Sequence, residues 1–311
     1  MNAPVTENEL DFYILQTRFT DPGEFASAYD ALPPLNANGT PQIDALCSIV
    51  RGIYVHYMDS RSPQDVERRK EVDLRHIDAR LRRALELDPA PITQPRPEDR
   101  RVVGCCHDAA LTLVSMLRHQ GIPARNRVGF ATYIRLPGGE GFHVDHVVAE
   151  YWNVVQQRWI LVDPEQDARL MRHNQIDFDV HDIPRDRFLV GGAAWQMCQA
   201  GEADPNLFGG APDDDFFRGM WPIRVRMLSD LCTLNRVELL LWDTWGWMNY
   251  GLELDDDALH LLDELAALTA ADPLDFAAVR RFWLAHPEFH APESVMCYSP
   301  IVEPFEVVLR L

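Results

Sequence analysis

The sequence predicts an α+β fold in which a helix packs on an antiparallel sheet, with additional N- and C-terminal helices. Residues 106–120 have apolar side chains at helical spacing, and Gly121 and Pro123 end that pattern. Three apolar stretches follow, and each is typical of a strand; they are 124–134, 144–155 and 158–162. The last two are close enough in sequence to form a hairpin, so the middle of the chain combines a helix with an antiparallel sheet.

The length of 311 residues suits one large domain or two smaller ones. We expect an N-terminal helical region over 1–100 that packs on a core over 101–190. A mainly helical C-terminal extension over 191–311 follows, and the three parts could equally form one continuous domain.

The regions on either side of the core are predicted from periodicity and from helix breakers. On the N-terminal side, helices are expected at 10–32, 42–58 and 68–87. Four prolines in 88–97 exclude a helix there. On the C-terminal side, an irregular stretch is expected at 165–222. Three helices should follow at 224–247, 256–271 and 275–284, and a final strand at 304–311.

The composition excludes several classes of protein. A net charge of −19 argues against nucleic acid and against an anionic membrane surface as the main partner. No stretch approaches the ~18 apolar residues of a membrane-spanning helix. The first nine residues lack the basic and apolar regions of a secretory signal, so we expect a cytoplasmic protein. Six cysteines in a chain of this length do not indicate a disulfide framework, and we expect free thiols.

One cysteine pair stands where a helix should begin. In Gly104-Cys105-Cys106 the second cysteine precedes the helical pattern, where unpaired N–H groups and the helix dipole favour a thiolate. The thiolate is the nucleophilic form of cysteine, which makes Cys106 the candidate nucleophile and Cys105 its rival. We expect Asp108 to cap the helix rather than to take part in chemistry.

A general base and an orienting carboxylate follow on the predicted hairpin. His146 lies near the start of one strand and Asp163 at the end of the next. Pairing of these strands would bring the two side chains together at the end where the helix begins. The order Cys106, His146, Asp163 therefore suits a nucleophile, a general base and a carboxylate that orients the imidazole.

Three blocks of this region resemble the transglutaminase-like superfamily, in its bacterial branch of cysteine-dependent amide-processing proteins. The first is Gly104-Cys105-Cys106 followed by a helix that ends in Leu-Arg-x-x-Gly-Ile-Pro-Ala-Arg at 117–125. The second is His146 with Glu150 four residues later, and the third is Trp159 followed by Asp163-Pro164. The resemblance implies a papain-like core in which Cys106, His146 and Asp163 form the catalytic triad.

These observations lead to a cysteine-dependent acyl transfer on an amide or thioester, ending in transamidation, amide formation or hydrolysis. The expected partner is an amide-, peptide- or acyl-thioester-bearing substrate, and a carrier protein is one form that such a substrate takes. No metal or organic cofactor is expected. The stretch 61–135 has 15 basic against 10 acidic residues, which is typical of a solvated helix face. To dock an acidic carrier, this stretch would have to present a basic patch despite the overall negative charge.

Two alternatives remain open at this stage. The chain could be a non-catalytic binding module that keeps the transglutaminase-like fold. A zinc-stabilised module could instead use Cys105, Cys106, His107 and His143, which are ligand types that zinc accepts. Adjacent cysteines lack the usual two-residue gap of a zinc site, and this is why we prefer thiol chemistry.

Overall fold

The computed structural model describes residues 8–309, and a five-stranded sheet lies at its centre. The strands of this sheet are β3 (Ala124–Ala131), β4 (His143–Asn153), β5 (Arg158–Val162), β6 (Phe188–Val190) and β7 (Phe208–Gly209). Their order is β5-β4-β3-β6, with antiparallel neighbours, and β7 runs parallel to β4. The predicted hairpin is confirmed, because β4 pairs with β5 in a register that sets Ala149 opposite Val162.

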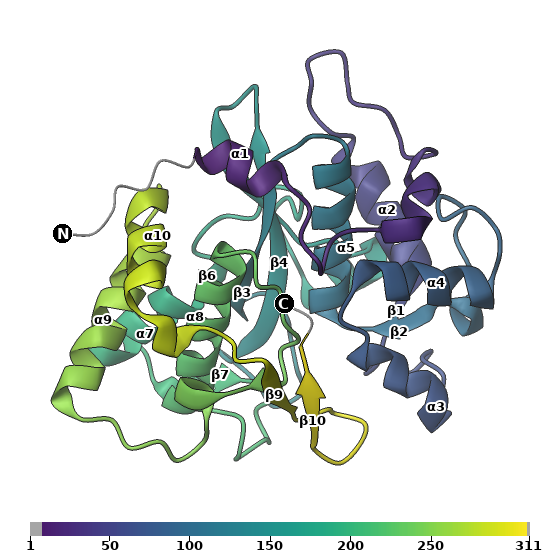
Figure 1. Cartoon of the computed structure of the whole chain (residues 1–311). Helices are drawn as coiled ribbons and strands as arrows, with labels where there is room; N and C mark the ends of the chain where they lie inside the picture. The colour runs from purple at the N-terminus through teal and green to yellow at the C-terminus, as the bar shows by residue number, and fades with distance from the viewer. Residues whose placement is uncertain (1–7, 310–311) are drawn as a thin grey trace.

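Helix α5 (Cys106–His119) packs against β3 and β4, as the sequence predicts. Each of its residues from Cys106 to Arg118 is buried, so it is enclosed on all sides. In Figure 1 the two long strands run between α5 on one side and α7 (Gly191–Gln199) and α8 (Met220–Leu234) on the other. The predicted α+β class, with a helix on an antiparallel sheet, is confirmed.

The N-terminal helices differ from the prediction in where they break. The helix predicted over 10–32 is wrong, because α1 (Glu9–Ile14) ends at an extended Leu15 and the chain turns at Gly23, which has a φ of +54°. A short 3-10 helix follows over Gly23–Tyr29. The helix predicted over 42–58 is confirmed as α2 (Ile43–Ile53). The residues that follow α2 form a short strand, β1 (Tyr54–His56), instead of continuing the helix.

The helix predicted over 68–87 is three separate pieces. They are α3 (Val66–Arg69), a 3-10 turn (Lys70–Asp73) and α4 (Ile77–Leu87). The break turns Glu71 inward, where its carboxylate accepts a hydrogen bond of 2.9 Å from the backbone N–H of Val103. Val103 lies in β2 (Val102–Gly104), which pairs in parallel with β1 (Tyr54–His56).

The C-terminal half contains two departures from the prediction. The stretch predicted to be irregular holds helices α6 (Ala168–Asn174) and α7, and Gly191 has no room for a side chain because a Cβ would lie 2.3 Å from the backbone nitrogen of Met227. The helix predicted over 224–247 ends early, since α8 stops at Leu234 and Arg236 has a φ of +62°.

The remaining C-terminal elements follow the prediction more closely. Helices α9 (Asp256–Ala270) and α10 (Phe276–Ala285) are confirmed, and so is a final strand, β10 (Phe305–Val308). Strand β10 pairs with β9 (Ser294–Cys297), which pairs with β8 (Asp243–Thr244) in a small antiparallel sheet.

Buried ion pairs connect the sheet to its surroundings. On β3, Arg127 forms two hydrogen bonds to the Asp230 carboxylate of α8, at 3.0 and 2.9 Å. Its neighbour Arg125 donates at 2.6 Å to Glu150, directly opposite on β4. Arg125 and Glu150, which belong to the first and second blocks that resemble the transglutaminase-like superfamily, therefore pair with each other in the structure. Because these charges are buried, the loss of one partner would leave the other uncompensated.

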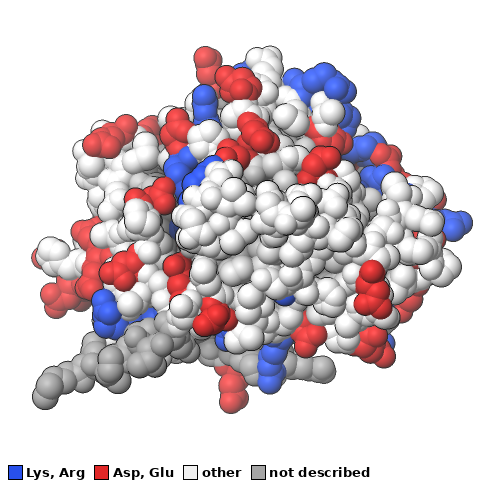
Figure 2. Space-filling view, turned by 90° about the horizontal axis from the view of Figure 1, so that it is seen from above, with Lys and Arg blue, Asp and Glu red and all other residues white. Residues whose placement is uncertain are grey.

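The surface seen in Figure 2 has no single-sign charge field. Acidic and basic side chains lie mostly around the edge of this face, and a broad area near its middle has no charged residue. In the part of the chain from 8 to 309, no helix is both long and apolar enough to cross a membrane. Residues 1–7, which belong to the segment where no secretory signal was predicted, lie outside the described residues.

We predict that Asp230→Ala lowers the free energy of unfolding by about 3–5 kcal/mol, because it leaves the Arg127 guanidinium buried without its counter-ion. Urea denaturation measures this loss. The matched control is Glu24→Ala, which removes an exposed partner of Arg82 and should change the free energy of unfolding by less than ~1 kcal/mol. Equal effects of the two substitutions would contradict the structural role of the buried pair.

Candidate active site

The start of α5 fixes the position of Cys106. The backbone N–H of Cys105 donates a hydrogen bond of 2.8 Å to Oδ2 of Asp108, so the predicted capping role of Asp108 is confirmed. Arg80 of α4 forms a buried ion pair with the same carboxylate. A side chain at position 104 would collide with this cap, since a Cβ on Gly104 would lie 2.8 Å from Oδ2 of Asp108. Cys106 is therefore the first residue of a firmly capped helix.

The two adjacent cysteines differ in their ionisation. A hydrogen bond from the Cys105 thiol, together with the charge of His146, holds the pKa of Cys106 well below its ordinary value. Burial, together with that same bond and with nearby negative charge, raises the pKa of Cys105 well above its ordinary value. Of the two thiols, Cys106 is therefore the one that favours the thiolate form. Its side chain is nearly enclosed, since the residue is 6% exposed.

His146 lies on β4, opposite Gly129 of β3. Its Nε2 is 2.8 Å from Oδ2 of Asp163, at the turn that follows β5. Burial opposes the charged imidazole, but Asp163 and the Cys106 thiolate overcome this and hold the pKa of His146 well above its ordinary value. The bond at Nε2 leaves Nδ1 as the ring nitrogen that can exchange a proton with another group.

The carboxylate of Asp163 is fully buried and well supplied with donors. Oδ2 also accepts hydrogen bonds from the Tyr133 hydroxyl at 2.8 Å and from Nε2 of Gln166 at 3.1 Å, and Oδ1 accepts one from the backbone N–H of Glu165 at 3.0 Å. Burial alone would raise the pKa of Asp163, but the His146 charge and these bonds hold it below its ordinary value. The aspartate therefore stays ionised beside the imidazole.

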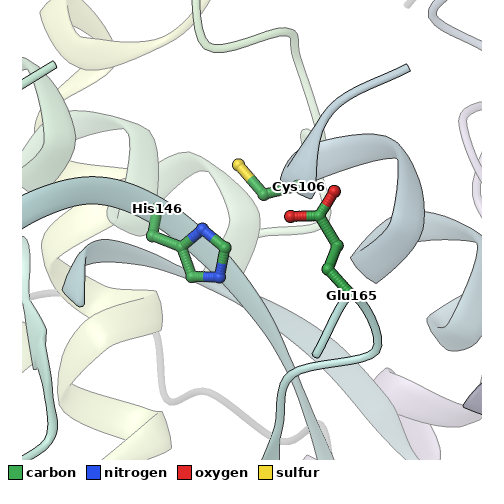
Figure 3. A group of neighbouring side chains, drawn as sticks. All are labelled: Cys106, His146 and Glu165. Carbon is green, nitrogen blue, oxygen red and sulfur yellow. The ribbon is translucent and has the colours of Figure 1, made fainter. Parts of the chain in front are cut away.

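The three predicted site residues come together, and a fourth joins them. Ligand-type atoms of Cys106, His146 and Glu165 all lie within 4.8 Å of one another. Figure 3 shows these side chains reaching the same point from the start of α5, from strand β4 and from the loop after β5. The arrangement gives a thiolate, an imidazole held by a carboxylate, and a further carboxyl group beside the sulfur.

Sequence reasoning missed Glu165, Tyr133 and Gln166, as well as His56 at the end of β1. Glu165 and Gln166 directly follow Asp163-Pro164 in the sequence, and this closeness to Asp163 indicates that they lie near the site. His56 pairs with Gly104 in the β1–β2 register, a parallel contact that no local pattern indicates. Burial lowers the pKa of His56, so this second imidazole stays neutral next to the Cys106–His146 ion pair.

The alternative zinc set is wrong as an arrangement. The His143 ring packs against Phe208, with 4.4 Å between the ring centroids, and Nδ1 of His107 lies 3.2 Å from the Asp108 carboxylate. Within residues 8–309, the group of ligand-type side chains that meets at one point is Cys106, His146 and Glu165 instead.

Comparisons with known proteins give a family match over the segment that contains these residues. Residues 73–164 match the family model of the transglutaminase-like superfamily, and a search of curated proteins finds no match. Among solved structures, the chain is similar to a candidate cysteine protease from Cytophaga hutchinsonii, with 17% identity over 53% of this chain and a TM-score of 0.31. The match covers 45% of that protein, less than half its length, and a TM-score of this size does not establish a common fold.

The similarity to this family is therefore confined to the matched segment. That segment runs from the turn before α4 to two residues beyond β5 and contains Cys106, His146 and Asp163. Through residues 73–164, the chain is similar to the transglutaminase-like superfamily.

Proposed function

We propose that this protein is a cysteine-dependent acyl-transfer enzyme in which Cys106 is the nucleophile, His146 the general base and Asp163 the orienting carboxylate. One observation carries the proposal: a sulfur at a helix start lies within 4.8 Å of an imidazole whose other nitrogen is held at 2.8 Å by a buried carboxylate. The ionisation directions of Cys106 and His146 support the same roles, because they favour a thiolate–imidazolium pair.

The reaction begins with attack of the Cys106 thiolate on the carbonyl carbon of an amide, ester or thioester. The backbone N–H of Cys106 has no acceptor within its own helix and is available to the oxyanion of the tetrahedral intermediate. The His146 imidazolium gives its proton to the leaving group, and the carbonyl reforms as a thioester on Cys106. No step of this sequence requires a metal or an organic cofactor.

The acyl-enzyme then reacts with an amine or with water. Transfer to an amine gives an amide, and transfer to water gives an acid. Because Cys106 is 6% exposed and His146 is 2% exposed, the acyl donor must be slender where it reaches the sulfur. This suits an extended peptide side chain or an acyl thioester carried on a flexible arm, and both stay within the proposal. All six cysteines are free thiols, which supports a cytoplasmic site of action.

We predict that a small activated ester, p-nitrophenyl acetate, leaves one acetyl group on Cys106 when the reaction is quenched in acid. Intact mass spectrometry followed by peptide mapping detects and locates this adduct. The Cys106→Ala variant should lack it, whereas Cys105→Ala should keep it because the Cys105 thiol stays protonated. Failure of the wild type to acylate, or equal acetylation of the two variants, would support a non-catalytic binding module instead.

The alkylation rate of Cys106 should depend weakly on pH. A free thiol with a pKa of about 8.5 loses roughly 50-fold in thiolate between pH 8.5 and pH 6.5. The lowered pKa of Cys106 keeps its thiolate as the pH falls through this range, so its rate with iodoacetamide should fall by less than about 3-fold. Quenched-flow mass spectrometry measures both rates. In His146→Ala the profile should move toward that of the free thiol, and an unchanged profile would contradict the ion pair.

A further inference from the structure

A carboxyl group beside the nucleophile has no role in the triad. Glu165 is half-buried in the loop after β5, and its own N–H is bound to Asp163 at 3.0 Å. Its carboxyl oxygen lies within 4.8 Å of both the Cys106 sulfur and a His146 ring nitrogen (Figure 3). The side chain therefore faces the place where the scissile bond must lie.

The Glu165 carboxyl group differs from the other buried acids near α5 and the central sheet. Asp108 is paired with Arg80, Glu150 with Arg125, and Asp230 with Arg127. By contrast, in the described part of the chain no side chain donates a hydrogen bond to the Glu165 carboxyl group or forms an ion pair with it within 4.0 Å. This acid therefore lacks a partner of its own.

The local charge balance is negative. Cys106 and Asp163 are acids that favour their ionised forms, and His146 supplies one imidazolium between them. His56 does not supply a second positive charge, because its burial favours the neutral ring. Burial, followed by the charge of the Cys106 thiolate, raises the pKa of Glu165 well above its ordinary value. A positively charged group entering the site would remove this cost and ionise the carboxyl group.

We propose that Glu165 is a specificity-determining residue that binds the ammonium group of an amine acyl acceptor, so that the acyl group passes to amines in preference to water. This inference rests on the proposed acyl-enzyme. A primary ammonium suits the position because it is compact, positively charged and rich in hydrogen-bond donors, and the site offers a carboxylate with free acceptor oxygens.

The proton balance of aminolysis also fits two bases at this distance. An ammonium must lose two protons to become an amide nitrogen. Glu165 takes the first, which frees the nitrogen lone pair to attack the thioester carbon and form the C–N bond. His146 takes the second as the C–S bond breaks, so the thiolate and the imidazolium are both restored. Glu165 then returns its proton to solvent.

The first test uses the charge of a small thiol reagent and needs no natural substrate. In each methanethiosulfonate, the Cys106 thiolate attacks the sulfenyl sulfur, forms a mixed disulfide and releases methanesulfinate. We compare the 2-aminoethyl, 2-sulfonatoethyl and methyl reagents at mildly alkaline pH, with EDTA present and with Cys106→Ser as the control for other thiols. Peptide mapping assigns the modified sulfur.

Glu165→Gln should lower the ratio of the cationic to the anionic rate by about 10-fold or more. The cationic reagent favours the ionised form of the carboxyl group beside the sulfur and is attracted by it, whereas the anionic reagent gains no such attraction. The neutral reagent should change by less than about 3-fold, which shows that the thiolate itself is unaltered. The matched control is Glu202→Gln, an exposed carboxylate after α7, which should leave the ratio unchanged. An unchanged ratio in Glu165→Gln would overturn the proposal.

The second test measures how the acyl-enzyme divides between an added primary amine and water. In Glu165→Gln the KM for the amine should rise about 10-fold or more, and the ratio of amide to acid product at a fixed amine concentration should fall. In the control Glu202→Gln both quantities should stay unchanged. If no acyl-enzyme forms but the charge ratio responds, the proposed function fails and cation recognition stands. If acylation is normal and neither readout changes, the role of Glu165 fails.

A thiolate, an imidazole and a carboxylate also suit zinc. A charge effect that appears only when EDTA is omitted would therefore assign the site to a metal and overturn amine recognition.

Discussion

The hydrogen bond between His146 and the buried Asp163 carboxylate is the interaction on which the rest of the site depends. A fully buried carboxylate is costly unless donors surround it, and here Oδ2 accepts from an imidazole, a phenol and an amide at once. The charge that Asp163 keeps in this environment is what stabilises an imidazolium at His146. That imidazolium, in turn, stabilises the thiolate of Cys106. Asp163 therefore acts on the sulfur through His146, and the hydrogen bond from the Cys105 thiol lowers the pKa of Cys106 as well.

A second set of buried charges holds the framework on which these groups sit. The Arg80–Asp108 pair joins α4 to the cap of α5, and the Arg127–Asp230 pair joins β3 to α8. Each pair fixes an element that carries or supports a site residue, so a small error in their geometry would separate the sulfur from the imidazole. Buried ion pairs add little net stability compared with apolar contacts, but they penalise a misplaced partner strongly. In this protein that penalty acts on the relative positions of the helix and the sheet.

The sequence allowed the central part of this arrangement to be predicted and left its surroundings unpredicted. Helix α5 and the β4–β5 hairpin follow from local periodicity, and a hairpin necessarily brings the ends of its strands together, which placed His146 near Asp163. The breaks at Leu15 and between α3 and α4 depend on tertiary contacts, such as the one between Glu71 and Val103, that periodicity does not contain. His56 reaches the site through the pairing of β1 with β2, and Tyr133 reaches it from the segment just after β3. Neither has a short-range signature.

The enclosure of the site and its negative charge have a common consequence for chemistry. An acyl-enzyme in an open site meets water at its bulk concentration, and an amine must compete with it. In a nearly closed site with an unpaired carboxyl group, the local concentration of a cationic amine rises while that of water falls. The same enclosure strengthens each charge, because fewer water molecules screen it. A closed, anionic cysteine site is thus suited to forming amide bonds, whereas a closed but neutral one would exclude water without attracting the amine. In the proposed reaction, the position of Glu165 beside the sulfur makes this difference.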